Sequence, residues 1–440
     1  MTISGVRVIR DALFFCASLI LFFLPLNAMA AGEYSFDVEE FESKSFEWGG
    51  YAEIKFDHID LNTDSAFYGL NFHQDPGSTI DRYTGALQLE YSYKKGLGAF
   101  NGVLRAEAGQ DDVGWSDSAD VYEANLSLTP TPFVTADIGK KVFKWGKGYA
   151  WNPVGFIDRT KDPNNPEEAL EGYFGAGVDL IKSLDGSIRT VALTTVALPV
   201  WRDVNEDFGE VNHVNLAAKL YLLCWNTDID FVIFSGSSRS TRYGVDFSRN
   251  LAENFEIHGE FAYLTDVKQK YLSEAGTLTQ KEHSANRHLL GLRYLTESDV
   301  TTIIEYYHNG AGFSASELER FYQLVADADI QLLNTGADTL YQEAKNISDM
   351  GYGSPQVGRN YLYLKINQKD PFDILYFTPG LITIVNLDDR SYSVSPEMLY
   401  TGFTNWEIRL RYTLLGGDDF TEFQEKQNEN KLEFRVRCYF

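Results

Sequence analysis

The sequence predicts an all-β protein: a closed antiparallel β-barrel of about 18 strands that crosses a membrane. Three observations support this. Apolar and polar residues alternate with a period of two in many segments, the connections between these segments are short and long in turn, and the final segment has an apolar face opposite a charged face. A period of two indicates strands whose faces meet different surroundings. Short turns at one end and long loops at the other are typical of membrane barrels.

The last ten residues show the alternation most clearly. One face carries Leu432, Phe434, Val436, Cys438 and Phe440, and the other carries Glu433, Arg435, Arg437 and Tyr439. An apolar face opposite three charges suits a strand that lies between lipid and water. From this strand alone, an edge strand of a soluble sandwich remains an alternative.

A chain that ends on such a strand resembles the outer-membrane β-barrel proteins of Gram-negative bacteria. The resemblance implies that the final strand closes the barrel and that Phe440 is a signal for the barrel-assembly machinery. It also implies a location in the outer membrane, in contact with its lipid and lipopolysaccharide.

The N-terminus carries the features of a secretory signal peptide. Arg7 and Arg10 precede an apolar run over residues 12–24, and Ala28 and Ala30 form a small-residue cleavage site. We therefore expect residues 1–30 to be a cleaved signal and residues 31–440 to form the barrel. The run is too short for a comfortable membrane-spanning helix, and no apolar run downstream is long enough for one.

Composition narrows the class of protein further. Aromatic residues make up 14% of the chain, which aromatic girdles at two membrane interfaces would explain. The formal net charge of −25 argues against nucleic acid as a partner. Cys224 and Cys438 are too few for a disulfide scaffold and fall on distant strands, so we expect two free thiols.

Alternating segments and their connections follow one another along the whole chain. The first strands are expected at 51–57, 83–93, 100–107, 121–128 and 134–140. Short connections lie at 94–98, 129–132, 183–186, 224–226, 250–254, 297–299, 368–371, 387–390 and 402–405, and an intermediate one at 236–241. Long connections lie at 58–80, 111–120, 141–175, 199–210, 266–286, 309–359 and 416–430. This order predicts about 18 strands with both ends on the short-turn side, and 16 is the alternative count.

The polar faces of the expected strands collect charges of both signs. The candidates for the lumen wall are Arg105, Arg293, Arg409, Arg411, Arg435, Arg437, Glu407 and Glu433. One interpretation is a charged pore wall. The other interpretation is that these charges pair across strands and do no more than keep the lumen hydrated. The four arginines from 409 to 437 lie on consecutive strands, so they also predict a local positive ladder.

The long connection 141–175, with the end of the strand before it, is rich in cations for an acidic protein. In general porins, which this chain resembles in architecture, the third long loop folds inward and narrows the channel. The resemblance therefore implies a constriction with the candidates Lys140, Lys141, Lys144, Lys147, Arg159 and Lys161. The alternative is a surface loop whose aromatic residues lie in the interfacial belt. A count of 18 strands is similar to substrate-selective porins and leaves monomer and trimer both open.

The connection 309–359 contains a predicted helix. Ser314 and Glu317 fit a capping box, and Leu318, Phe321 and Val325 follow with helical spacing. An amphipathic helix within a loop needs an apolar surface to pack on. It is therefore a candidate lid over the barrel mouth, with packing on neighbouring loops as the alternative.

Catalytic and metal-binding patterns are not found in the sequence. There is no serine elbow, no paired-histidine helix and no metal-ligand spacing, so we predict no catalytic residues, metal or cofactor. The predicted function is a channel for passive diffusion of small hydrophilic solutes, with anionic solutes as one candidate class. The alternative is a non-conducting barrel that serves surface assembly, export or partner binding.

Overall fold

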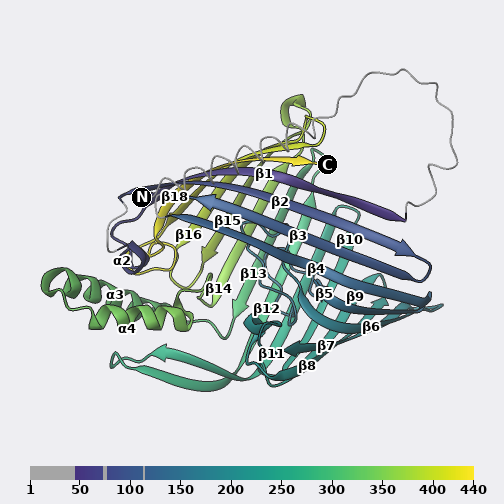
Figure 1. Cartoon of the computed structure of the whole chain (residues 1–440), viewed down its shortest axis with the longest axis horizontal. Coiled ribbons are helices and arrows are strands. Elements are labelled where there is room, and N and C mark those ends of the chain that lie inside the picture. Colours follow the sequence, from purple (N-terminus) through teal and green to yellow (C-terminus); the bar gives the residue numbers. More distant parts are fainter. Residues whose placement is uncertain (1–44, 73–76, 112–113) are drawn as a thin grey trace, which may run out of the picture. The chain divides into compact units, whose positions relative to one another are not determined.

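The computed structural model describes residues 45–72, 77–111 and 114–440, which form one antiparallel sheet closed on itself (Figure 1). The expected signal peptide, residues 1–30, lies outside the described residues. Across the described part of the chain, no helix is long and apolar enough to cross a membrane.

Eighteen strands form the sheet, and each pairs with the next along the chain. They are β1 (Phe46–Leu61), β2 (Thr79–Lys95), β3 (Gly98–Gln110), β4 (Trp115–Thr131), β5 (Val134–Lys141), β6 (Tyr173–Ser183), β7 (Ile188–Val200), β8 (His213–Cys224), β9 (Thr227–Ser235), β10 (Arg242–Ala252), β11 (Phe255–Leu272), β12 (Leu278–Leu295), β13 (Val300–Asn309), β14 (Asn360–Gln368), β15 (Phe377–Asn386), β16 (Tyr392–Tyr400), β17 (Trp406–Gly416) and β18 (Asn428–Tyr439). β1 also pairs with β18, so the sheet is a closed barrel. The predicted count of 18 is confirmed, and the alternative of 16 is wrong.

Helices occupy some of the connections. In the described residues they are α2 (Ala66–Phe72), α3 (Ala315–Thr335) and α4 (Thr339–Ile347), with short helical turns η2 (Glu206–Phe208), η3 (Ser348–Tyr352) and η4 (Pro371–Asp373). α3 starts at the segment where the sequence predicts a helix. The Ser314 side chain accepts a hydrogen bond from the backbone N–H of Glu317, and the Glu317 side chain accepts one from the N–H of Ser314, which makes a capping box.

Two connections that the sequence predicts to be long are mostly strand. β3 and β4 leave only residues 111–114 between them, where a loop over 111–120 is expected. β11 and β12 continue through the expected loop 266–286 and form a hairpin that projects past the barrel in Figure 1. Polar residues occupy both faces of these extensions, so the apolar alternation that marks a lipid-facing strand is absent from them.

The two faces of the barrel wall differ as the alternation predicts. On β18, Leu432 and Phe434 are 37% and 44% exposed, whereas Glu433 and Arg435 are 2% and 6% exposed. The charged face therefore points inward. Exposed aromatic residues lie near both ends of the outer face, among them Trp48, Tyr93, Phe133 and Trp225 near the short turns and Tyr83, Phe174, Tyr243 and Tyr263 near the long loops. This distribution fits aromatic girdles at two membrane interfaces.

The two cysteines in the described part of the chain do not pair with each other. Cys224 and Cys438 are both free thiols, as predicted from their distant strands.

The inner face is not polar all the way round the barrel. Along β7, Val196, Leu198 and Val200 are buried among inward-facing apolar residues, and a second apolar group includes Tyr361 and Ile384 of β14 and β15. Both groups pack against residues of the connection between β5 and β6. The expectation of a generally charged inner face therefore holds for part of the wall only, because a buried loop supplies an apolar partner for the rest.

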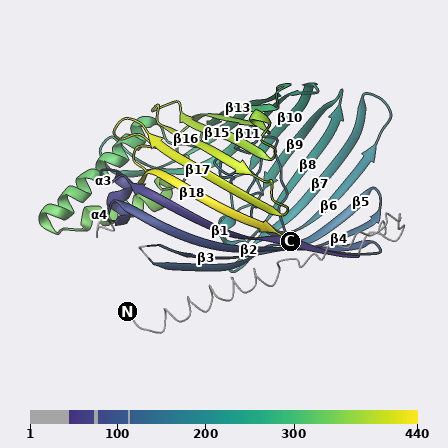
Figure 2. The same ribbon diagram turned by 90° about the horizontal axis from the view of Figure 1, so that it is seen from above.

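Several connections join in one apolar cluster at the long-loop end, which we call the cap. Its buried members come from α2, α3, α4, η3 and the tip of β11, and include Phe67, Leu272, Phe321, Tyr341 and Tyr352. Figures 1 and 2 show α3 and α4 side by side beyond the ends of the strands. The amphipathic α3 thus finds its apolar partners in neighbouring loops.

The closing contact between β1 and β18 suggests a test of assembly. The backbone of Phe440 exchanges two hydrogen bonds with Gly50, of 3.1 and 3.2 Å, and the rings of Phe440 and Trp48 lie 5.9 Å apart. We expect deletion of Phe440 to lower the amount of protein in the outer membrane by roughly tenfold or more, because the edges of β1 and β18 are then poorly joined. Fractionation with gel migration before and after heating measures this. Phe403→Ala, at an exposed turn, is the control, and equal amounts of both variants would contradict the role of Phe440.

Candidate functional site

The connection between β5 and β6, residues 142–172, packs on the inner face of the barrel, and we call it the lumen loop. Trp145 and Phe156 of this loop are 2% and 1% exposed and lie among apolar residues of the inner wall. Trp151 stacks on Tyr307 of β13 with 5.0 Å between ring centroids. Because the loop forms no helix or strand here, its backbone N–H groups need other acceptors.

Glu260 of β11 supplies one of these acceptors. It is 4% exposed and accepts hydrogen bonds from the backbone N–H groups of Lys147, Gly148 and Val154 at 2.6, 2.7 and 3.0 Å. Gly146 has φ of +100°, and a Cβ at this position would lie 2.8 Å from Glu260 Oε1. The glycine allows the backbone to approach the carboxylate closely.

Glu305 of β13 is a second acceptor on the barrel wall. Its carboxylate accepts the backbone N–H groups of Tyr149 and Ala150 at 2.5 and 2.9 Å. It also lies 2.8 Å from Nε2 of His258, the inward-facing histidine of β11. Glu260 and Glu305 together tie residues 147–154 to two strands.

Asp158 makes a third such contact within the loop itself. It accepts the N–H groups of Phe143, Lys144 and Trp145 at 2.9, 3.0 and 2.8 Å. Burial raises the pKa of Asp158, and the three N–H donors act in the opposite direction. The first part of the loop is thus closed on itself as well as tied to the wall.

The second part of the lumen loop reaches the charged part of the wall. Glu167 pairs with Lys365 of β14 at 2.9 Å, and Asn165 accepts a hydrogen bond from Arg411 of β17 at 2.8 Å. Glu168 contacts three wall arginines, Arg105, Arg435 and Arg437, at 3.2, 3.5 and 3.4 Å. Burial of Glu168 would raise its pKa, but these three cations outweigh it and the pKa is lowered.

The register of β17, β18 and β1 places three cations side by side, which we call the cation row. Arg409 lies opposite Arg435, and Arg435 lies opposite Lys55. Neighbouring rows hold carboxylates that offset this repulsion: Arg409 pairs with Glu433 at 2.9 Å and Arg435 with Glu407 at 2.8 Å. Like charges opposite one another are otherwise unfavourable.

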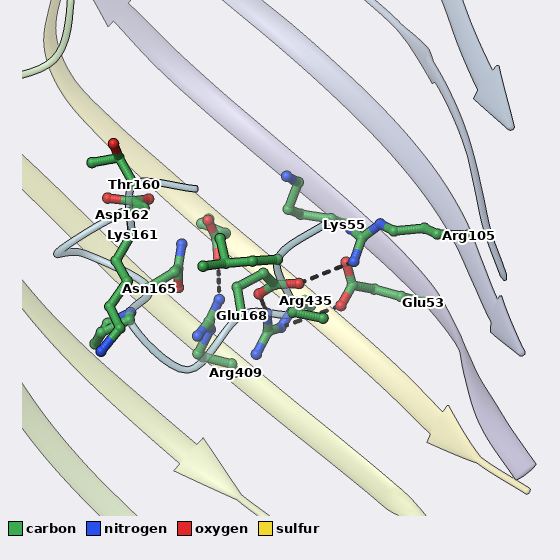
Figure 3. Close-up of a pocket in the computed structure, with 14 residues that line it drawn as sticks. Glu53, Lys55, Arg105, Thr160, Lys161, Asp162, Asn165, Glu168, Arg409 and Arg435 are labelled. Carbon is green, nitrogen blue, oxygen red and sulfur yellow. Dashed lines mark hydrogen bonds and ion pairs between the residues drawn. The ribbon is translucent and has the colours of Figure 1, made fainter. Parts of the chain in front are cut away.

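A cavity of about 280 Å³ separates the cation row from the lumen loop (Figure 3), and we call it the central cavity. Its lining residues are Glu53, Lys55, Arg105, Arg409, Glu433 and Arg435 from the wall, with Thr160, Lys161, Asp162, Asn165, Pro166, Glu168, Ala169 and Leu170 from the loop. Charged side chains of both signs therefore face the same space. The arrangement can bind and orient a small polar or charged solute.

The six candidate constriction residues are spread over different surroundings. Lys140 lies in register with Ala124 and Phe174, on the face of β5 that carries the exposed Ile138, and pairs with Glu171. Lys141 is on the opposite face and pairs with Asp137 at 2.6 Å. Lys140 therefore does not share the inner face of β5.

The remaining four candidates belong to the lumen loop. Lys144 is exposed, and Lys147 pairs with Asp230 of β9 at 2.9 Å. Arg159 pairs with Glu171 at 2.8 Å and with Asp207. Lys161 donates hydrogen bonds to the carbonyl oxygens of Gly148 and Tyr149 at 2.8 and 3.3 Å, and burial lowers its pKa. Of the six candidates, only Lys161 lines the central cavity.

The candidate wall residues lie on inward-facing positions. Arg293 is in register with Glu256, Arg411 pairs with Glu397 at 2.6 Å, and Arg437 pairs with Glu53 at 2.7 Å. Arg105, Arg409, Arg435 and Glu433 line the central cavity, and Glu407 holds Arg435. The arginines that suggested a ladder are thus individually paired with carboxylates.

Sequence reasoning did not single out several residues that the site uses. Lys55 and Glu53 alternate with apolar residues on the first strand, so the sequence predicts that they point inward. Their position beside Arg435 depends on the pairing of β1 with β18 and could not be predicted. The loop residues Asn165 and Glu168 carry no periodic signal. Glu260 and Glu305 lie on polar strand faces, but their role as acceptors for the lumen loop could not be predicted, because a partner formed by loop backbone leaves no mark in the side-chain pattern.

The fold and its inward charges define the class of protein. A closed antiparallel barrel of 18 strands, with an apolar outer face and a loop packed inside, has the fold of outer-membrane β-barrels of the porin type. This agrees with the predicted location in the outer membrane of a Gram-negative bacterium.

Solved structures of porins share this fold. A BenF-like porin from Pseudomonas fluorescens Pf-5 has a TM-score of 0.55 at 10% identity, covering 90% of this chain and 99% of that one. Acinetobacter baumannii OccAB1 has a TM-score of 0.52 at 9% identity, covering 89% and 96%. Pseudomonas aeruginosa OccK5 (OpdH) has a TM-score of 0.51 at 10% identity, covering 90% and 98%. No protein-family model matches the chain, and no curated protein matches it in sequence.

The carboxylate contacts of the lumen loop suggest a second test. We expect Glu260→Ala to speed amide hydrogen exchange at residues 147, 148 and 154 by about tenfold or more, because three N–H groups lose a charged acceptor. Hydrogen exchange followed by mass spectrometry measures this. Glu282→Ala, on the exposed part of β12, is the control. Unchanged exchange at these amides in Glu260→Ala would mean that other contacts hold the loop.

Proposed function

We propose that this protein is a channel for passive diffusion of small hydrophilic solutes, and that it favours anionic ones. The observation that carries the proposal is the cation row of Arg409, Arg435 and Lys55, which faces the lumen loop across the central cavity. The residues of the lumen loop that line this cavity would form the constriction.

Charges in a narrow lumen act more strongly than charges on an open surface. Low-dielectric walls focus their field, and bulk salt screens them less. Carboxylates pair with most of the wall cations. The lumen would therefore attract anions through a local excess of positive charge and not through a large net charge. Such a balance allows a solute to bind weakly and to leave again, as conduction requires.

The surroundings that we propose for the barrel follow from its fold. Membrane lipid would cover the outer face, lipopolysaccharide would meet the long-loop end, and the barrel-assembly machinery would insert the closing strand. The cap would act as a lid at that end, because its buried cluster joins three connections near the mouth, those between β1 and β2, β11 and β12, and β13 and β14.

A second candidate function is a non-conducting barrel for surface assembly, export or partner binding. The observation in its favour is the extent of packing inside the barrel, where Trp145, Trp151 and Phe156 of the lumen loop fill the space against the apolar wall. Current through single molecules in a planar bilayer separates the two functions. A barrel that migrates normally on heating but carries no current would support the second.

Neutralising the cation row tests the preference for anions. We expect Arg409→Gln with Arg435→Gln to shift the reversal potential in a KCl gradient toward cation selectivity, most strongly at low salt, because two focused positive charges are lost. The control is Lys182→Gln with Arg249→Gln, which removes two exposed cations near the short turns. Equal selectivity of wild type, variant and control would contradict an anion-favouring row.

A further inference from the structure

Two histidines lie side by side on the outer face of the barrel near the long loops, and we call them the histidine pair. His288 of β12 is in register with His308 of β13. Their ring centroids lie 4.7 Å apart, with 25° between the ring planes. Their chain neighbours Leu289 and Tyr307 are inside the barrel wall, at 3% and 8% exposure. Because side chains alternate across a strand, both imidazoles point outward.

The histidine pair lies at the edge of the apolar outer surface. The next row toward the short turns holds Leu290, Tyr306 and Leu362, one from each of β12, β13 and β14. Leu290 and Leu362 are 62% and 37% exposed, as lipid-facing side chains are. In the other direction β13 ends at Asn309, one residue beyond His308. A tyrosine at the edge of an apolar surface is typical of a membrane interface, so the histidine pair lies where lipid gives way to water.

Asn360 of β14 extends the row and determines which nitrogen of His308 carries the proton. It is in register with His308, and its Oδ1 lies 2.8 Å from Nδ1 of that ring. The other side of the amide sets its orientation, because Nδ2 donates to Oδ1 of Asp388 at 2.7 Å and the backbone N–H donates to Oδ2 at 3.0 Å. The Tyr306 hydroxyl donates to the same Asn360 oxygen at 2.8 Å. An amide oxygen only accepts, so Nδ1 of His308 is protonated and Nε2 keeps its lone pair.

Metal-binding histidines share this arrangement. A ligating imidazole donates its other N–H to a carbonyl or a carboxylate, which fixes the tautomer and the orientation of the ring. Here the hydrogen bonds run from His308 to Asn360 and from Asn360 to Asp388, an exposed carboxylate whose charge favours a nearby cation. His288 adds a second imidazole from the facing strand. Two protons on rings this close would repel each other, so the pair favours the neutral form that a metal ion needs.

We propose that the histidine pair binds a divalent transition-metal ion, Zn²⁺ or Cu²⁺, through Nε2 of His308 and one ring nitrogen of His288. Imidazole suits these ions, whereas Ca²⁺ and Mg²⁺ prefer oxygen ligands. A tetrahedral zinc ion with Zn–N bonds of about 2.0–2.1 Å holds its two nitrogens roughly 3.3 Å apart, which rotation of one of the stacked rings provides. In the described residues no group of three or more His, Cys, Asp and Glu side chains surrounds one point. Water therefore completes the coordination, and the ion binds reversibly.

The sequence carries no sign of this site because its ligands come from two strands. Metal motifs are recognised by ligands at fixed short spacing. His288 and His308 instead meet through the register of β12 with β13, and the Asn360 contact depends on the register of β13 with β14. The site is on the outer face, so this inference does not rest on the proposed channel function.

The test is a calorimetric titration of the full-length protein with ZnCl₂, in detergent micelles and without a histidine tag. We expect His288→Phe and His308→Phe, which keep a ring but remove its nitrogens, each to weaken zinc binding by about tenfold or more, because one of two ligands is lost. Asn360→Ala should weaken it by about tenfold, because the His308 ring loses the acceptor that orients it. The matched control is His213→Phe, which removes an imidazole from the long-loop end of β8 and should leave the affinity unchanged.

A spectroscopic measurement identifies the ligands. Electron paramagnetic resonance of the protein loaded with CuCl₂ should show two coordinated nitrogens in the wild type and fewer in His288→Phe. Equal zinc affinity in the wild type and in the double variant His288→Phe with His308→Phe would overturn the proposal, and so would displacement of zinc by an equal concentration of Ca²⁺. The same loss of affinity in His213→Phe would also overturn it. Heat-dependent gel migration confirms that each barrel is folded, and His288→Gln with His308→Gln serves if a Phe variant fails to fold.

Discussion

The closure of the sheet is the constraint on which the rest of this structure depends. A strand that crosses lipid must pair every backbone N–H and C=O group within the protein, because hydrocarbon offers no partner. The pairing of β1 with β18, from Tyr51 opposite Tyr439 to Leu61 opposite Asn428, meets that requirement. A circle of 18 strands is too wide for wall side chains to fill. The interior must therefore be occupied by a loop, by water or by both.

The lumen loop occupies part of the interior and contacts the apolar and the charged parts of the wall in different ways. On one side, apolar wall residues such as Val196 and Tyr361 pack against the loop as they would in a protein core. The loop backbone then needs hydrogen-bond acceptors, which Glu260 and Glu305 provide. A buried carboxylate is costly when it is alone, and several N–H donors offset that cost. The other end of the loop is held against the charged wall by its own ion pairs, such as those of Glu167 with Lys365 and of Glu168 with Arg105.

The charged wall shows why net charge is a poor guide to the field within a barrel. The chain carries −25 formally, yet Arg409, Arg435 and Lys55 lie side by side facing the lumen loop. Carboxylates in the neighbouring rows, such as Glu433, keep this arrangement stable. An anion near the wall responds to the cation whose charge is least offset, and in this row it is Lys55, which lies 3.8 Å from Asp57.

The sequence alone determined the closed barrel, its 18 strands and the inward face of β18. The period-two alternation carries this information because lipid favours apolar side chains on one face of a strand and water favours polar ones on the other. The order of short and long connections gives the number of strands. The extensions of β4, β11 and β12 into expected loops were missed because polar residues occupy both of their faces. The wall arginines and the carboxylates Glu407 and Glu433 were found by periodicity, but the pairs that they form were not, since strand register decides which residues lie opposite one another. Lys140 and Lys147 could not be told apart by spacing, although one shares a face with the exposed Ile138 and the other pairs with the buried Asp230. Only the tertiary structure decided where the lumen loop lies, because the hydrogen bonds that tie residues 147–154 to the wall are donated by backbone N–H groups, which every sequence possesses.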